Sequence, residues 1–225
     1  MLFHKPINTY LKGFTDHHSH ILPGVDDGVK KMEVSLQVLE KYEQLGIAEV
    51  WCTPHTMEDI PNTTEGLKSR FAELCEAYKG PIKLHLASEY MMDGLFEERL
   101  AKGDLLTLGD EGNQLLVETS YYTPPMDMEL ILKEIKRKGY FPVLAHPERY
   151  VYMNKERYHE LKADGIRFQL NLSSMAGAYG PEAKKKAQWI LRKKYYNLAG
   201  SDLHSIRNIS FWESRAPRAL RMLLG

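Results

Sequence analysis

The residues best suited to chemistry in this sequence are histidines and carboxylates that recur in short groups along most of the chain. Neutral imidazole and carboxylate groups are the ligands that hold Mg, Mn, Zn or Fe in proteins. One such group would indicate little, but six groups predict a polynuclear metal centre that the fold assembles. The groups are Asp16-His17-His18-Ser19-His20, Thr53-Pro54-His55, Ser88-Glu89, Val117-Glu118-Thr119, Ala145-His146-Pro147-Glu148-Arg149 and Ser201-Asp202-Leu203-His204.

Short β-like runs alternate with amphipathic helical stretches, which is the pattern of repeated βαβ units. Glycines that can close a helix with a left-handed turn stand just before four strands, at Gly46, Gly80, Gly139 and Gly165. The predicted helices cover residues 34–45, 67–78, 128–137, 155–163, 182–194 and 211–223. The predicted strands are Gly13–His18, Ile47–Thr53, Ile82–Glu89, Gln114–Thr119, Phe141–His146, Arg167–Leu172 and Tyr196–Ser201. We expect one α/β domain over residues 1–225, built as a parallel barrel slightly short of eight strands.

The candidate ligands fall at or just beyond the carboxyl ends of these strands, which is the face where βα barrels carry their chemistry. His18 and His20 are two residues apart, so on an extended segment both rings point the same way. Asp202 and His204 repeat this spacing near the end of the chain. The periodicity of the elements and the chemistry of the ligands therefore predict the same site independently.

Composition narrows the class of protein. The 225 residues contain 30 basic and 30 acidic side chains, and a formal net charge of zero argues against a general nucleic-acid binder. No apolar run approaches the length of a membrane span, and the first residues have no apolar signal-peptide core. The expected compartment is the cytoplasm.

The two cysteines, Cys52 and Cys75, are too few for a disulfide framework, and we expect both to be buried as small apolar residues. They also exclude a tyrosine phosphatase that uses a thiolate nucleophile. Its Cys-x5-Arg loop would need arginine at position 58 or 81, and these positions hold Glu58 and Pro81. Any phosphatase activity must therefore depend on metal.

These motifs resemble the PHP (polymerase and histidinol phosphatase) superfamily. More narrowly, they are similar to the manganese-dependent protein tyrosine phosphatases of bacterial capsule and exopolysaccharide systems. The matching segments are the run His18-Ser19-His20-Ile21-Leu22-Pro23-Gly24-Val25-Asp26-Asp27-Gly28, with Thr53-Pro54-His55, Ala145-His146-Pro147-Glu148-Arg149-Tyr150 and Ser201-Asp202-Leu203-His204. The resemblance spans nearly the whole domain. It implies a distorted (β/α)7 barrel with a trinuclear metal site at the carboxyl ends of the strands.

The resemblance also implies a role for each matching residue. Two arginines would hold phosphate: Arg149 in the His-Pro-Glu-Arg motif, and Arg207, which follows the last motif sooner than the family pattern. The motif favours Asp27 over Asp26 as a ligand. His17 stands where the family has an apolar residue, which leaves a shifted ligand as an alternative. The implied metal ligands are His18, His20, Asp27, His55, Glu89, Glu118, His146, Asp202 and His204.

The charge of this ligand set suits phosphate. The set contains four carboxylates and five neutral imidazoles, and three divalent ions would bring six positive charges, which leaves two. A phosphate monoester dianion would neutralise that excess. If a hydroxide were bound as well, the positive charges of the arginines would balance it.

The sequence therefore predicts metal-dependent hydrolysis of protein phosphotyrosine. Manganese is the expected ion, with Fe, Zn or Mg as alternatives. The resemblance implies a bacterial tyrosine autokinase, phosphorylated on its tail, as the partner, and an oligomer is possible. One alternative is a phosphatase for histidinol phosphate or another small phosphomonoester, because a fold does not set its substrate. Another is a non-catalytic metal-binding regulatory protein. Tyr121 and Tyr122 should lie near the mouth of the site, either against an entering tyrosine ring or as part of a rigid loop.

Overall fold

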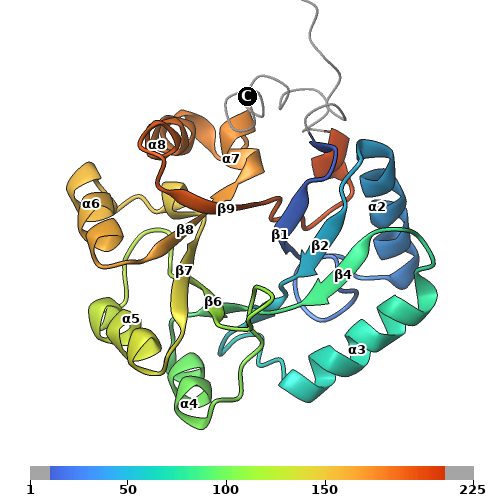
Figure 1. The fold of residues 1–225 in the computed structure, drawn as a ribbon, viewed down its shortest axis with the longest axis horizontal. Coiled ribbons are helices and arrows are strands. Elements are labelled where there is room, and N and C mark those ends of the chain that lie inside the picture. Colours follow the sequence, from blue (N-terminus) through green and yellow to red (C-terminus); the bar gives the residue numbers. More distant parts are fainter. Residues whose placement is uncertain (1–10, 211–225) are drawn as a thin grey trace, which may run out of the picture.

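In the computed structural model, which describes residues 11–210, parallel strands alternate with helices. Figure 1 shows the strands around a common interior, with the helices on the outside. One sheet has the strand order β1-β2-β4 and the other has the order β3-β5-β6-β7-β8-β9. The strands are β1 (Thr15–Ser19), β2 (Glu49–Cys52), β3 (His55–Thr56), β4 (Lys83–Leu86), β5 (Glu89–Met91), β6 (Gln114–Glu118), β7 (Phe141–Ala145), β8 (Arg167–Asn171) and β9 (Tyr196–Gly200).

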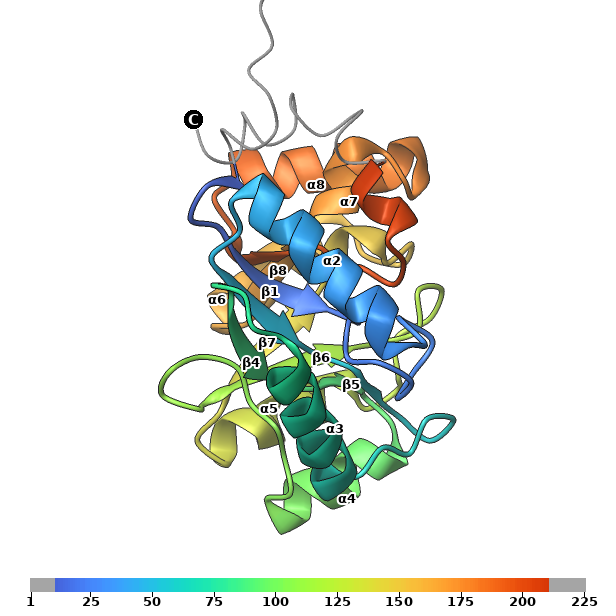
Figure 2. The same cartoon turned by 90° about the vertical axis from the view of Figure 1, so that its right-hand side faces the viewer.

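The helices follow the strands along the chain and cover their outer side, as the turned view in Figure 2 also shows. None of the helices in residues 11–210 combines the length and the apolar character needed to span a bilayer. The helices are α2 (Met32–Leu45), α3 (Thr64–Ala77), α4 (Gly94–Lys102), α5 (Met128–Arg137), the 3-10 helix η1 (Pro147–Arg149), α6 (Lys155–Ala163), α7 (Leu172–Ala176) and α8 (Gly180–Arg192).

Side chains along the central strands alternate between two apolar clusters. On β6, Leu115 packs with the helices on the outer side, whereas Leu116 packs in the interior with Trp51. On β7, Leu144 and Val143 divide in the same way. Both faces of these strands are buried, as expected for parallel strands covered by helices.

Two of the seven predicted strands are interrupted in the middle. The predicted strand Ile47–Thr53 corresponds to β2, and a break at Pro54 separates it from β3. The predicted strand Ile82–Glu89 corresponds to β4 and is separated in the same way from β5. Backbone hydrogen bonds of 2.9 and 3.1 Å still cross the interruption, so the two sheets are joined there. As a result, His55 and Glu89 open the short strands β3 and β5 and are paired in register.

The outer strands β1 and β9 also lie side by side. The carbonyl of His18 accepts a 2.7 Å hydrogen bond from the amide of Asp202, just beyond β9. The amide of His20 donates to the carbonyl of Leu203 at 3.0 Å. Two segments 180 residues apart in sequence are thereby held in register, and each carries a predicted pair of ligands.

Some local predictions were wrong. Cys75 is exposed rather than buried, because it lies on the outer face of α3, whereas Cys52 is buried as expected. Gly80 does not close a helix, since α3 ends at Ala77 without a left-handed residue. Helices α4 and α7 were missed, although Asp93 accepts from the amide of Phe96 as a recognisable N-cap of α4. The predicted helix 211–223 lies outside the described residues.

Asp16 is a buried carboxylate that ties β1 to the end of β9 and to α2. Its Oδ1 accepts a 2.7 Å hydrogen bond from the amide of Ser201, and its Oδ2 accepts one of 2.9 Å from the hydroxyl of Tyr42. Burial raises the pKa of Asp16, and the hydrogen bonds from Ser201, His18 and Tyr42 oppose that rise. The outer strands therefore depend on a polar network with no access to water.

We expect Tyr42→Phe to lower the free energy of unfolding by about 1.5–3 kcal/mol, the range for a buried hydrogen bond to a charged group. The matched control is Tyr158→Phe, which removes a buried hydroxyl that donates to the neutral carbonyl of Pro147 at 2.9 Å. That variant should lose only about 0.5–1.5 kcal/mol. Urea unfolding of both variants measures the difference. An equal or smaller loss for Tyr42→Phe would contradict this role of Asp16.

Candidate metal centre

Glu89 lies at the middle of the predicted site, and its carboxylate is fully buried. Its Oε2 lies 3.2 Å from Nε2 of His18, 3.3 Å from Nε2 of His20 and 3.1 Å from Nδ1 of His55. Its Oε1 lies 3.0 Å from Nε2 of His146. Glu89 Oε2 and His55 Nδ1 have no hydrogen-bond partner among the described residues. Four rings from three different parts of the chain thus converge on one carboxylate.

The tautomers of His18 and His20 are set by acceptors on the far side of each ring. Nδ1 of His18 donates to Oε1 of Gln169 at 2.9 Å, and Nδ1 of His20 donates to Oδ2 of Asp26 at 2.7 Å. When the rings are neutral, both Nε2 atoms present lone pairs toward the site, and they lie only 3.0 Å apart. Two lone pairs at this distance repel each other unless a proton or a cation lies beside them. Carboxylate and amide partners of this kind orient the histidine ligands of metals in other proteins.

Asp202 approaches the same rings from the other side. Its Oδ1 lies 3.5 Å from Nε2 of His18 and 3.4 Å from Nε2 of His20, and it has no hydrogen-bond partner within residues 11–210. Its Oδ2 accepts hydrogen bonds of 2.7 Å from both Arg149 Nη1 and Asn171 Nδ2. One oxygen is therefore held in place while the other is directed at the imidazoles without a donor.

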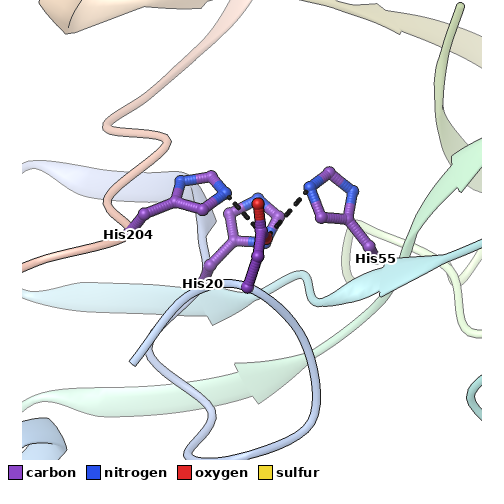
Figure 3. A group of neighbouring side chains, drawn as sticks. His20, His55 and His204 are labelled. Atoms are coloured by element: carbon purple, nitrogen blue, oxygen red, sulfur yellow. Dashed lines mark ion pairs between the residues drawn. The ribbon is translucent and has the colours of Figure 1, made fainter. Parts of the chain in front are cut away.

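A third group of residues lies nearer to the surface. Figure 3 shows the rings of His20, His55 and His204 converging from separate segments. Between them lies Asp27, whose Oδ1 is 3.6 Å from Nε2 of His55 and 3.3 Å from Nε2 of His204. A hydrogen bond from His204 and the nearby imidazoles lower the pKa of Asp27 to about 2. This carboxylate is the exposed member of the cluster and can meet solvent.

All nine residues predicted as metal ligands come together. Their ligand atoms form four overlapping groups, in each of which the atoms lie within 4.8 Å of one another. The orphaned oxygens of Glu89 and Asp202 and the facing lone pairs of His18 and His20 fit a site built for cations. The groups are His20, Asp27, His55 and His204; His18, His20 and Asp202; His18, Glu89 and His146; and His55, Glu89 and Glu118.

Two of these residues have an unusual backbone. His146 has a φ of 34° and Asp202 has a φ of 52°, in the left-handed region that residues with a side chain seldom adopt. His146 directly follows β7 and Asp202 is the second residue after β9, and the turn directs each side chain into the cluster. Strain of this kind, of order 1–3 kcal/mol per residue, gathers at functional sites.

Asp26 and His17 were the alternative ligands that the sequence left open, and neither belongs to the four ligand groups. Asp26 is buried, and it bonds to the ring of His20, the amide of Gly28 and the amide of His55. It positions one ring and stays outside the ligand groups. The ring of His17 points the other way and contacts the carbonyl of Ala199 at 3.2 Å.

Gln169 is a site residue that sequence reasoning missed. Its Oε1 accepts from the ring of His18 and from the amide of His146 at 3.2 Å, so one side chain holds two of the predicted ligands. Its only sequence signal was a polar residue inside the predicted strand 167–172, where an unpaired amide would be costly to bury.

Arg149 lies at the edge of the cluster between two aromatic rings. Its guanidinium carbon is 4.3 Å from the ring centre of Tyr121 and 4.0 Å from that of Tyr179. With the hydrogen bond to Asp202, the group is fixed on three sides, and its side chain is 14% exposed. Arg207, the other predicted arginine, has an exposed side chain and makes no ion pair with residues 11–210.

Comparison with known proteins shows which class of protein this chain resembles. Tyrosine-protein phosphatase YwqE of Bacillus subtilis (strain 168) is 28% identical over 216 residues, which cover 93% of this chain and 85% of the relative. Tyrosine-protein phosphatase CpsB of Streptococcus pneumoniae is 29% identical over 204 residues, which cover 85% of this chain and 83% of the relative. Both relatives are named as tyrosine-protein phosphatases, and each match covers most of both chains.

Two solved structures of phosphatases also resemble this chain. A crystal structure reported for YwqE from Bacillus subtilis and CpsB from Streptococcus pneumoniae, unique metal-dependent tyrosine phosphatases, superposes with a TM-score of 0.82 at 27% identity and covers 92% of this chain and 86% of the other. Histidinol phosphate phosphatase from Lactococcus lactis superposes with a TM-score of 0.54 at 13% identity, covering 91% of this chain and 93% of the other, and so shares the fold.

The family described as capsular polysaccharide synthesis, CpsB/CapC, matches residues 14–221. The chain belongs to this family.

The electrostatics of the cluster predict that metal uptake releases protons. Burial and the charge of His20 lower the pKa of His55, but Glu89 and Glu118 beside it outweigh them and raise that pKa to about 10. Below that pH the metal-free ring carries a proton that a metal must displace. We expect manganese binding near pH 7.5 to release protons and to strengthen as the pH rises. Calorimetry in two buffers of different ionisation enthalpy measures the number released.

The same titration of His55→Ala serves as the comparison and should release fewer protons. Manganese binding to the original chain with no net release of protons, or binding that weakens as the pH rises, would contradict this account of the cluster.

Proposed function

We propose that this chain hydrolyses protein phosphotyrosine with the help of divalent metal ions, manganese foremost. The observation that carries the proposal is a set of inward ligand atoms: Oε2 of Glu89 and Oδ1 of Asp202 lack hydrogen-bond donors, and Nε2 of His18 and Nε2 of His20 face each other at 3.0 Å. Nitrogen and oxygen ligands without thiolate suit manganese, magnesium, iron or zinc. The residues that would hold up to three ions are His18, His20, Asp27, His55, Glu89, Glu118, His146, Asp202 and His204.

We further propose that residues 1–225 form one domain, a distorted (β/α)7 barrel. Three observations support it. The strands of the two sheets follow the chain in order, hydrogen bonds join the sheets at the strand breaks, and β1 bonds to the segment after β9. The interior cluster of Trp51, Leu116 and Val143 would fill the barrel. Its mouth would then be the edge where all the predicted ligands meet.

When bound, the divalent ions lower the pKa of water, so that hydroxide is available near neutral pH, and they offset phosphoryl charge. Arg149 supplies the protein's own positive charge at this edge. Because Asp202 and the two tyrosines fix its guanidinium, its remaining N–H groups can meet phosphoryl oxygens without first being ordered. A tyrosine leaves as a phenolate with a pKa near 10, so it needs little help from an acid.

We keep Arg207 as a proposed second phosphate contact on the strength of the resemblance alone. Its exposed position on the segment after β9 leaves its guanidinium free to move toward a bound phosphate. Its contribution should therefore be smaller than that of Arg149, which is already held in place.

The physiological partner that we propose is the phosphorylated, tyrosine-rich tail of a bacterial autokinase of capsule synthesis. Membership of a capsular polysaccharide family supports this choice. We place the enzyme in the cytoplasm, where the free thiols Cys52 and Cys75 would remain reduced. A homo-oligomer is compatible with the proposal.

The two alternative functions, a histidinol phosphatase and a non-catalytic metal-binding protein, place different demands on the site. A histidinol phosphatase could use the same fold and the same ions, but its leaving group is a poor alkoxide that needs an acid more than a phenolate does. A non-catalytic metal-binding protein needs only a closed set of about four ligands. The nine residues gathered here, with one carboxylate open to solvent, favour turnover.

The experiment that tests the function compares substrates with manganese present. We expect kcat/KM for a phosphotyrosine peptide to exceed that for the matching phosphoserine peptide and for histidinol phosphate by at least about tenfold, because only the phenolate leaves without an acid. A strong chelator should abolish turnover, and added manganese should restore it. If histidinol phosphate is preferred by tenfold, the small-molecule function replaces this one. Full activity in metal-free protein would refute the metal centre.

Substitutions should separate metal binding from phosphate binding. His146→Ala should lower both the metal content and the rate. Arg149→Ala should keep the metals, because Asn171 still holds Oδ2 of Asp202, and should lower kcat/KM about ten- to a hundredfold through lost charge-assisted hydrogen bonds. The matched control is Arg167→Ala, an arginine that stacks on Phe141 at the start of β7. It should change neither metal content nor rate.

Metal analysis and steady-state kinetics on the same preparations decide the outcome. If Arg149→Ala loses metal to the same extent as His146→Ala, the arginine acts by holding a ligand and not on the substrate.

A further inference from the structure

The loop that leaves the metal centre after β6 leads directly to a groove on the outside of the molecule. Residues 119–127 begin beside Glu118 and end at α5. Tyr121 in this loop stacks on Arg149, so the first part of the loop borders the proposed phosphate site. The last part, with Pro124, Pro125 and Met126, forms one wall of the groove.

The opposite wall comes from the segment after η1 and from α6, which neighbours α5 in Figure 1. The groove has a volume of about 610 Å³ and is lined by Leu130 of α5 and by Tyr152 and Arg157 from the other wall. Bound side chains of one or two residues fit a hollow of this size, which lies within the usual range for ligand sites.

Direct hydrogen bonds fasten the loop to this opposite wall. The amide of Val151 donates to the carbonyl of Tyr121 at 2.8 Å. The hydroxyls of Thr119 and Tyr152 lie 2.6 Å apart, and the ring of Tyr152 stacks on Tyr150. The groove is therefore formed before anything binds, which reduces the entropy lost on binding.

Exposed apolar side chains gather along this path. Six large apolar side chains are exposed in residues 11–210; Met126 and Leu130 line the groove, whereas Phe141 lies at the amino end of β7. Met126 is fully exposed and Leu130 is 64% exposed. Scattered apolar residues need no explanation, but a continuous group marks an interaction site. Tyr122 lies in the same loop as Met126, and the exposed Val151 bonds to that loop through its amide.

Three glutamates face one lysine and one arginine in the lining of the groove, so its net charge is negative. Nη1 of Arg157 lies 3.1 Å from carboxylate oxygens of both Glu129 and Glu160. The remaining charged groups of the lining are Glu156 and Lys133, one of each sign. Because its arginine is paired with carboxylates and its net charge is negative, the groove disfavours a second phosphate, and its exposed apolar side chains favour an apolar partner.

We propose that this groove binds an apolar side chain of the substrate polypeptide, close in sequence to the phosphotyrosine; the inference rests on the proposed phosphatase activity. The groove is continuous with the edge of the metal centre through a single loop. Tyr121 and Met126 are five residues apart, which spans at most roughly 18 Å of extended chain at about 3.3–3.6 Å per residue. The anchoring residue should therefore stand within about six residues of the phosphotyrosine.

The test compares peptides with an aryl phosphate. A phosphotyrosine peptide of serine and alanine carries one leucine, which is moved through the six positions on each side. At the favoured position we expect kcat/KM to rise about three- to tenfold over the peptide without leucine, through a lower KM, as partial burial of one side chain would give. Met126→Ser and Leu130→Ser should remove this gain and leave turnover of the aryl phosphate unchanged.

Phe141→Ser is the matched control, since it removes an exposed apolar side chain from the opposite end of the strands and should leave the gain intact. If no leucine position raises kcat/KM, or if the gain survives in both groove variants, the proposal is overturned while the phosphatase stands. If the original chain hydrolyses no aryl phosphate with manganese, the function fails and the groove proposal fails with it. If light scattering shows a dimer that only the groove variants abolish, the surface serves self-association instead.

Discussion

The structure depends on one electrostatic constraint: carboxylates and imidazoles are buried together with their lone pairs facing inward. Glu89 Oε2 has three ring nitrogens within 3.3 Å and no hydrogen-bond partner within residues 11–210. Desolvation alone would raise the pKa of Glu89, but the charges of His18 and His55 hold it well below its usual range. Such a group of buried charges is stable only with protons or cations between its members. The surrounding fold provides the geometry that makes those positions suit cations.

Residues around the cluster hold its side chains in these positions through hydrogen bonds and through their backbone conformations. Gln169 and Asp26 each fix a ring so that its free nitrogen faces inward. Asp16 holds the two outer strands together from within the protein. His146 and Asp202 take a strained backbone conformation that turns their side chains toward the others. Apolar packing on both sides of the strands offsets the free-energy cost of this strain and burial.

The sequence predicted the ligands better than their supports, and the reason is physical. Metal ligands are limited to a few residue types, and parallel strands place them at one end, so His18 and Glu118 could be recognised from type and position. A support such as Gln169 is defined only by what it touches across the fold. The interruption at Pro54 depends on pairing with a strand more than 30 residues later. Exposure of Cys75 depends on which face of α3 meets the sheet, and that face buries Leu67 and Leu74 but not Cys75.

The fold is shared within the family, whereas the choice of substrate depends on other parts of the molecule. The fold is shared with a histidinol phosphate phosphatase at 13% identity, so the arrangement of strands cannot by itself choose between a small phosphate ester and a polypeptide. That choice has to be made where the substrate extends beyond the phosphate, outside the cluster. Arg149 marks the boundary, because Asp202 holds it on the inner side while Tyr121 and Tyr179 cover its two faces. Beyond Tyr121 the chain continues into residues 122–127, whose exposed apolar side chains lie outside the ligand groups. Selectivity for a polypeptide can therefore change through this loop without disturbing the buried charges.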